Sequence, residues 1–368
     1  MVRGLASRGA QIVLLTQYPL SDPFLVEFIE DVKRDTKNLL MTAEQVDLES
    51  LHSIRQFATK WIDNAPPRRL DMIVLCANTI TPSRGKVQST SEGVELNWQV
   101  NYLANFHLLS ILSPALRAQP PDRDVRVVFG TCSSYIGGDL LHIKQPAQPQ
   151  TGSKAKSQAN GKPSAVNPST QEPTKFSPGN AYATSKLALT TFALAFQKHL
   201  SAYQRPDKAP MNTKVILADP GFSRTPGTRR WLSWGSLIGL FFYLILYPLW
   251  WMVLKSPGMG AQSFLHAAMD ETFTRGNGGW LIRECQVRQF KRAEVRDEEI
   301  QKRLWKYSEE MVQEAEKRGA EKRTKTKHEE KERKDEEAAV KEMEDYREKV
   351  GKKAGQKTEG SRRSKKSG

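Results

Sequence analysis

The chain has 368 residues, of which 38% are hydrophobic and 26% are charged, and its formal net charge is +15 at pH 7. This positive charge favours an anionic partner, such as nucleic acid, an anionic membrane surface or a phosphorylated cofactor. The three cysteines, Cys76, Cys132 and Cys285, lie far apart in the sequence. Their spacing argues against a disulfide framework and against a zinc site.

Apolar, strand-like runs alternate with amphipathic segments through the first 290 residues. The predicted strands are 11–16, 70–76, 125–132, 214–218 and 279–282, and the predicted helices are 24–34, 50–62, 92–116, 181–200 and 260–269. Strands of a parallel sheet are nearly continuous apolar runs, because helices cover both faces of the sheet. The alternation therefore predicts a doubly wound α/β fold with a parallel sheet over residues 1–290.

Two polar segments interrupt or follow this pattern. Residues 144–178 are rich in Gln, Pro, Ser, Lys and Asn, and such a composition cannot bury enough apolar surface to offset the entropy of ordering. We therefore expect a flexible insertion there. Residues 291–368 are rich in Lys and Glu, and we expect them to form a charged tail that is helical or disordered.

Tyr182 and Lys186 are four residues apart in the predicted helix 181–200, and residues at this spacing share one face of a helix. An ammonium group near a phenol lowers the pKa of the phenol from its ordinary value of about 10. Such a tyrosine can protonate a carbonyl oxygen during reduction or deprotonate an alcohol during oxidation. The alternative is a chance pairing on a solvated helix face.

Three further motifs accompany this pair. Asn101 lies within a long predicted helix, Ser133 and Ser134 follow an apolar strand, and Pro220-Gly221 follows the next strand. With these motifs in this order, the sequence resembles the short-chain dehydrogenase/reductase family over roughly its first 285 residues. The resemblance implies an oxidoreductase that uses NAD or NADP. We slightly prefer NADP, because the surroundings of the expected cofactor site are basic.

By this resemblance, Tyr182 is the proton donor or acceptor, and Lys186 tunes Tyr182 and holds the nicotinamide ribose. Ser134 hydrogen-bonds and orients the substrate oxygen, with Ser133 as the alternative if the register differs by one residue. Asn101 positions a water molecule in a proton relay. The alternative for Asn101 is a buried polar side chain that bridges a helix and a strand.

The resemblance also implies residues beside the cofactor. Pro220, Gly221 and Thr225 lie next to the nicotinamide. Asp47 matches the acidic residue that contacts adenine, and its alternative is a helix N-cap. Asn78 stands where the family has a glycine, and we expect Asn78 to supply the left-handed conformation of that glycine.

The family places a strand and a glycine-rich turn where backbone N–H groups approach the cofactor pyrophosphate. Residues 3–9 of this sequence match the end of the helix that follows that turn. We therefore expect the chain to be a truncated isoform or an incomplete gene model. A sheet without this strand would leave apolar surface and unpaired backbone groups on the neighbouring strands.

The segment 229–255 contains an uncharged apolar run, residues 231–254, which is bounded by Arg229-Arg230 and Lys255. Its length would suit a transmembrane helix, but strands of one sheet are predicted both before and after it. We therefore expect it to enter and leave a membrane on the same side, as a hairpin bent near Pro248 or as helices in the interface. The alternative is a substrate lid buried against the protein.

This segment resembles one found in a fungal, retinol-dehydrogenase-like branch of the family that is associated with lipid droplets and the endoplasmic reticulum. We predict an oxidoreductase that interconverts a lipophilic alcohol and carbonyl compound at the cytosolic face of one of these membranes, with a homodimer as one expected form. The alternative is a catalytically inactive membrane adaptor. Nucleic acid is not an expected partner, because the charged tail offers no aromatic stacking platform.

Overall fold

The computed structural model describes residues 1–64, 68–140 and 177–363, with the side chains of 339, 342 and 344–363 excepted. The flexible insertion predicted at 144–178 lies outside the described residues, apart from its last two. The chain divides into two units, Met1–Glu316 and Lys317–Gly368. The first of these contains every strand of the described chain.

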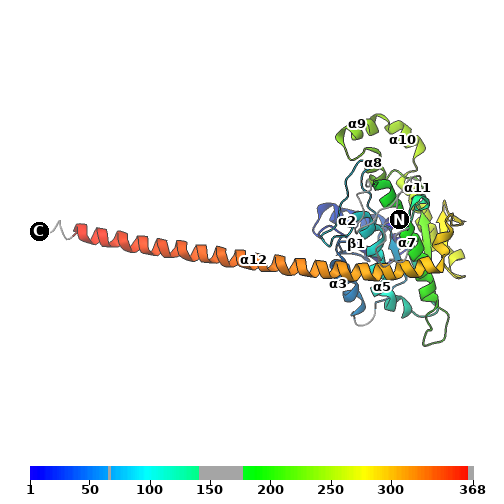
Figure 1. Ribbon diagram of the computed structural model, residues 1–368, viewed down its shortest axis with the longest axis horizontal. Helices are drawn as coiled ribbons and strands as arrows, with labels where there is room; N and C mark the ends of the chain where they lie inside the picture. Colours follow the sequence, from blue (N-terminus) through cyan, green and yellow to red (C-terminus); the bar gives the residue numbers. More distant parts are fainter. Residues whose placement is uncertain (65–67, 141–176, 364–368) are drawn as a thin grey trace, which may run out of the picture. The chain divides into compact units, whose positions relative to one another are not determined.

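The strands form two sheets (Figure 1). In the smaller sheet, β1 (Ile12–Thr16) pairs in parallel with β2 (Met41–Gln45). The larger sheet has the order β3 (Met72–Leu75), β4 (Val125–Gly130), β5 (Thr213–Asp219), β6 (Trp280–Arg283) and β7 (Gln286–Arg288), in which only β7 is antiparallel among the described strands. The predicted parallel α/β arrangement is confirmed, whereas β2, β7 and the division into two sheets were not predicted.

Helices cover both faces of the larger sheet. Successive residues of each strand point to opposite faces, so one strand contacts the helices on both sides. Val127 and Phe129 of β4 share one core cluster with residues of α5 and α7, whereas Val128 belongs to the cluster of α11. The helices of this unit before the apolar segment, together with α11, are α1 (Val2–Ala6), α2 (Pro23–Thr36), α3 (Leu51–Ile62), α4 (Leu96–Trp98), α5 (Ala104–Arg117), α7 (Pro178–Ser201) and α11 (Pro257–Met269). Between α4 and α5, the π-helical turn η1 (Gln99–Leu103) continues the same helix.

The smaller sheet is weakly buried. No residue of β1 is buried, and the Leu15 side chain is 41% exposed. Among the described strands, β1 pairs only with β2, and β3 pairs only with β4. Each of these two strands therefore has one unpaired edge among the described strands, and Leu15 is the exposed apolar side chain of β1, whereas no side chain of β3 is exposed.

The apolar segment forms three short helices, α8 (Pro226–Leu232), α9 (Leu237–Ile245) and α10 (Tyr247–Val253). The helix is interrupted at Leu246, two residues before Pro248, where the bend was predicted. None of the helices in the described ranges is long and apolar enough to cross a membrane. The Leu237 side chain is 84% exposed, so the alternative of a lid buried against the protein is not observed.

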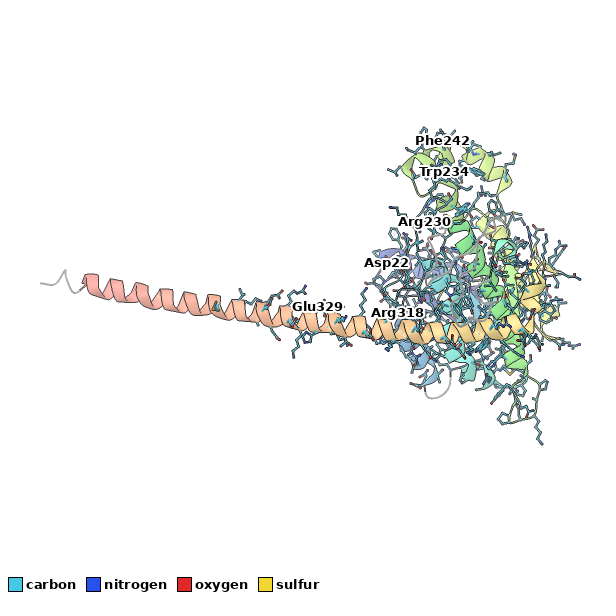
Figure 2. The ribbon with its side chains drawn as sticks, in the orientation of Figure 1. Asp22, Arg230, Trp234, Phe242, Arg318 and Glu329 are labelled. Atoms are coloured by element: carbon cyan, nitrogen blue, oxygen red, sulfur yellow. The ribbon has the colours of Figure 1, made fainter. Side chains whose placement is uncertain are left out.

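The helices α9 and α10 project away from the sheets, at the top of the view (Figure 1). Figure 2 shows Phe242 at the outer end of this projection and Arg230 nearer to the sheets. We call α9 and α10 the apolar hairpin.

The long helix α12 (Glu298–Arg363) begins within the first unit. Leu304 and Ala315 are buried in the main core, and Arg55 forms an ion pair with Glu316 at 2.6 Å. The first unit therefore ends at Glu316 rather than near residue 290. Beyond Glu316, the backbone is helical as far as Arg363.

Candidate active site

The candidate site lies at the carboxyl ends of β3, β4 and β5. Parallel strands point in the same direction, so the loops that follow them meet at one edge of the sheet. These loops contain Asn78 after β3, Cys132 after β4 and Gly221 after β5. Tyr182, near the start of α7, extends toward the first two loops, as its contacts show.

The Tyr182 hydroxyl group contacts two side chains. Its oxygen lies 3.4 Å from the Cys132 sulfur, and it also forms a hydrogen bond with the Asn78 side chain. Burial raises the pKa of Tyr182 above its ordinary value, and the nearby Cys132 adds to this effect. The prediction of a lowered pKa was wrong for the protein without ligands, because removal from water disfavours the phenolate.

Lys186 lies one helical turn after Tyr182, as the spacing predicted. Its amino group donates a hydrogen bond to the Gly130 carbonyl oxygen at 3.1 Å and lies 5.8 Å from the centre of the Tyr182 ring. The side chain is almost completely buried, and this burial lowers the pKa of Lys186. The end of β4 therefore fixes the amino group over the ring.

Asn101 connects three elements of the site. Its Oδ1 accepts a hydrogen bond from the Thr79 backbone N–H at 2.8 Å, and its Nδ2 donates to the Thr79 carbonyl oxygen at 2.9 Å. The same Nδ2 donates to the Ser185 hydroxyl group at 3.1 Å. Asn101 thus bridges η1, the loop after β3 and α7, whereas the alternative interpretation expected a bridge between a helix and a strand. Its role in placing a water molecule stays a prediction.

Neither Ser133 nor Ser134 forms a hydrogen bond with Tyr182 in the described part of the chain. Ser133 donates a hydrogen bond to Asp219 at 3.0 Å and accepts one from Arg283 at 2.9 Å. Ser134 is exposed in the short helix η2 (Ser133–Gly137). The side chain of this loop that lies at the Tyr182 hydroxyl group is Cys132, which the sequence analysis missed. The strand was predicted to continue through Cys132, but it ends at Gly130.

Two expected cofactor-binding residues after β5 also have structural roles. Gly221 follows Pro220, has a φ of +70° and donates its N–H to Asp219 at 2.8 Å. A side chain at this φ would be strained. Thr225 is the N-cap of α8, since its hydroxyl oxygen accepts the Thr228 N–H at 3.3 Å.

Asp47 follows β2 and is not the N-cap of α3. That position belongs to Ser50, whereas the Asp47 carboxylate accepts the Glu49 N–H at 2.9 Å. Asn78 does not have the left-handed conformation expected of it, because its φ is not among the positive values of the described residues. Its contact with Tyr182 is made by the side chain instead.

The residues of this arrangement fit the nicotinamide half of a dinucleotide. Lys186, Tyr182 and Gly221 come from elements that meet at the same edge of the larger sheet. For the pyrophosphate, three closely spaced glycines normally follow a strand and begin a helix. No described strand is followed by such a turn.

Known proteins similar to this chain are oxidoreductases. No family model matches the chain. The uncharacterized oxidoreductase pbr1 of Schizosaccharomyces pombe is 41% identical over 329 residues, which cover 88% of this chain and 81% of that protein. Retinol dehydrogenase 13 of Mus musculus is 28% identical over 84% of this chain and 78% of that protein.

Two further comparisons agree with these. Polyprenol dehydrogenase of Mus musculus is 32% identical over 71% of this chain and 64% of that protein. A crystal structure of an uncharacterized protein from Mycobacterium paratuberculosis has the same fold, with a TM-score of 0.52 and 19% identity over 85% of this chain and 87% of that one. From these relatives and the Tyr182–Lys186 geometry, we conclude that the chain belongs to the short-chain dehydrogenase/reductase family of oxidoreductases.

Proposed function

We propose that the protein is an NAD(P)-dependent oxidoreductase that interconverts a lipophilic alcohol and its carbonyl compound at a membrane or lipid-droplet surface. The observation that carries the proposal is the Tyr182 hydroxyl group beside Cys132 and Asn78, with the Lys186 amino group fixed over its ring. Two relatives are named for retinol and polyprenol. Both compounds are lipophilic alcohols, which supports this substrate class.

The residues of the chain supply the proton in this reaction. The raised pKa of Tyr182 keeps its phenol protonated at neutral pH, so it can donate a proton to a carbonyl oxygen during reduction. The Lys186 ammonium stabilises the phenolate that remains. A bound nicotinamide cofactor supplies or accepts the hydride, and Lys186, Gly221 and Thr225 would hold its nicotinamide end. NADP is our slight preference.

Replacing Tyr182 with Phe tests the proposed chemistry. We expect Tyr182→Phe to lower kcat by at least about 100-fold, because the proton donor is lost while the ring remains. The matched control is Tyr203→Phe, at a half-exposed tyrosine whose ring packs on Arg117. Thermal unfolding of both variants checks the fold. Full activity of Tyr182→Phe with a lipophilic alcohol would contradict the mechanism.

The membrane part of the proposal rests on the apolar hairpin. The exposed fractions of Ile238 and Trp251 are 68% and 65%, and contiguous exposed apolar surface is typical of interaction sites. Residues 229–255 include no acidic residue, and Arg229 and Arg230 are exposed beside the hairpin. An apolar surface flanked by cations suits an anionic lipid surface.

Co-sedimentation with vesicles of phosphatidylcholine and phosphatidylserine tests this surface. We expect the double variant Ile238→Ser, Trp251→Ser to bind at least about tenfold more weakly than the natural chain. The matched control is Phe24→Ser, at an exposed apolar side chain on α2. Equal binding by the double variant would remove the membrane from the proposal.

The second candidate function is a catalytically inactive membrane adaptor. The observation that favours it is the exposed apolar hairpin, whose contact with a lipid surface would require neither a cofactor nor Tyr182. Calorimetric titration of the 368-residue chain with NADPH and with NADH separates the two candidates. Vesicle binding without binding of either cofactor would favour the adaptor.

A further inference from the structure

We propose that the loop after β3, residues 79–87, is a second membrane-contacting element beside the apolar hairpin, and that Arg84 of this loop binds anionic lipid headgroups. This inference rests on the membrane part of the proposed function, because the hairpin makes the apolar contact. It adds a residue that selects the lipid by its charge, and it fixes which side of the protein faces the membrane.

The loop after β3 packs on the chain segment that leads from α8 into the hairpin. The Arg84 guanidinium carbon lies 4.4 Å from the centre of the Trp234 ring. Two residues earlier in the loop, Pro82 lies against Gly235, since a Cβ atom at Gly235 would come within 2.8 Å of the proline ring. The loop and the root of the hairpin therefore form one continuous surface.

Trp234 has an unusual backbone conformation at this junction. Its φ is +54°, and such left-handed backbone is strained for a bulky residue and persists only where the surroundings impose it. The attraction between the Arg84 guanidinium and the indole ring is one such constraint. Figure 2 shows Trp234 between Arg230 and Phe242, at the border of basic and apolar surface. Tryptophan is enriched at the corresponding level of a membrane, where headgroups meet acyl chains.

The surface at this border is basic. Four exposed cations belong to the two segments that meet there, namely Arg84, Lys86, Arg229 and Arg230. Residues 79–91 and 220–269 include no aspartate or glutamate. An arginine keeps its charge in proteins and binds phosphate groups well, whereas a second copy of this surface would bring like charges together. The charge therefore favours an anionic membrane as the partner of this surface.

The same loop is continuous with the candidate site. Asn78 immediately precedes it and forms a hydrogen bond with Tyr182, and Asn101 holds both backbone groups of Thr79. Contact of the loop with lipid would therefore turn the edge of the sheet that carries Tyr182 toward the membrane, from which a lipophilic substrate comes.

Co-sedimentation of the full chain with two kinds of vesicle tests the selection by charge. One kind contains phosphatidylcholine alone, and the other also contains phosphatidylserine. We expect Arg84→Gln to bind the phosphatidylserine vesicles about fivefold more weakly, which is the effect of one cation near an anionic surface, and to bind phosphatidylcholine vesicles like the natural chain. Arg84→Lys keeps the charge and should bind both kinds within about twofold of the natural chain.

The matched control is Arg68→Gln. The Arg68 guanidinium carbon lies 5.0 Å from the centre of the Trp61 ring, so this variant removes the same kind of pair and the same charge. Arg68 precedes β3, whereas Arg84 follows it, which places the two arginines at opposite ends of that strand. Equal loss of binding in Arg84→Gln and Arg68→Gln would overturn the inference, as would equal loss in Arg84→Gln and Arg84→Lys. Thermal unfolding of each variant checks the fold.

Hydrogen exchange of the natural chain separates the loop from the hairpin. With phosphatidylserine vesicles present, we expect the backbone amides of residues 79–91 and of 237–253 to exchange at least about threefold more slowly, while those of α3 are unchanged. Protection of the hairpin alone would overturn this inference and leave the membrane part of the proposed function intact. Protection of neither segment would remove both. A dimer that forms without lipid and is lost in Arg84→Gln would assign the surface to a second copy instead.

Discussion

The two sheets are built from the same kind of α/β unit but differ in burial. β4 and β5 are buried along almost their whole length, whereas β1 has no buried residue and β2 has only Met41. The core of the larger sheet includes the aromatic cluster around Phe192. The buried core of the smaller sheet consists of Ala6, Val32 and Met41.

This difference divides the candidate site into a firmly held part and a weakly held part. Tyr182 and Lys186 lie on a helix that packs on β5, and their positions are fixed by buried contacts. Asp47 follows the weakly buried β2. Because local stability follows buried contacts, the proton-transferring groups are positioned before any ligand binds, whereas the part expected to meet adenine is easier to displace.

The largest expected effect is on the core of the larger sheet. Phe192 is 1% exposed and packs against the rings of Phe106 and Phe129. We expect Phe192→Ala to lower the free energy of unfolding by about 3–5 kcal/mol. Val32→Ala, in the smaller cluster, should lower it by about 2 kcal/mol. Urea unfolding measures both, and equal effects would contradict the comparison.

Acid should reduce the difference in stability between the two regions. His107 of α5 is 3% exposed, and burial lowers the pKa of His107 to about 4. Since an unfolded histidine has a pKa of about 6.5, the unfolded chain binds more protons between about pH 6.5 and 4. Stability should therefore fall through that window, by about 3 kcal/mol at most.

His107→Gln is the control for this pH dependence, because glutamine keeps a polar side chain and does not titrate. Urea unfolding at pH 7 and at pH 4 should show a smaller loss in this variant than in the natural chain. An identical loss in both proteins would assign the pH dependence to other groups.

Hydrogen exchange compares the two sheets directly. We expect the backbone amides of β4 and β5 to exchange at least about 100-fold more slowly than those of β1 and β2, because opening the larger sheet exposes more apolar surface. Mass spectrometry of exchanged peptides gives both rates from one sample. Similar protection of all four strands would show that the smaller sheet is held as firmly as the larger.

The smallest expected effect is at the start of α2. Asp22 is its N-cap, and its carboxylate accepts the Leu25 N–H at 2.9 Å. Asp22→Ala should lower the stability of the smaller region by about 1 kcal/mol. Asp22→Asn, which keeps an N-capping oxygen, is the matched control. Faster exchange in β4 as well as in β1 would show that the two regions open together.

Much of the fold could be predicted from the sequence, because periodicity reports which side chains are buried. The central strands and the long helices were found this way, and the bend near Pro248 followed from the position of the apolar segment between two strands. β2 was missed, because Met41–Gln45 contains only one large apolar side chain. Exposed β7 was missed for the same reason.

The candidate site was predicted less completely. Helical spacing placed Tyr182 and Lys186 on one face, since this needs no tertiary information. The partner of Tyr182 depended on where β4 ends. Because the strand ends two residues earlier than predicted, Cys132 rather than Ser134 lies at the Tyr182 hydroxyl group. The pKa of Tyr182 depended on its burial, which the spacing of Tyr182 and Lys186 does not report.

The π-helical turn η1 makes the site depend on the number of residues in a helix. Asn101 lies in the middle of this turn, where both of its amide atoms reach the Thr79 backbone. Each residue of an α-helix advances by about 100° around the axis. An in-frame deletion of Tyr102, between Asn101 and α5, would therefore rotate Asn101 relative to α5. Such an allele would keep every side chain type of the site in its sequence and still lose the support of the loop that carries Asn78.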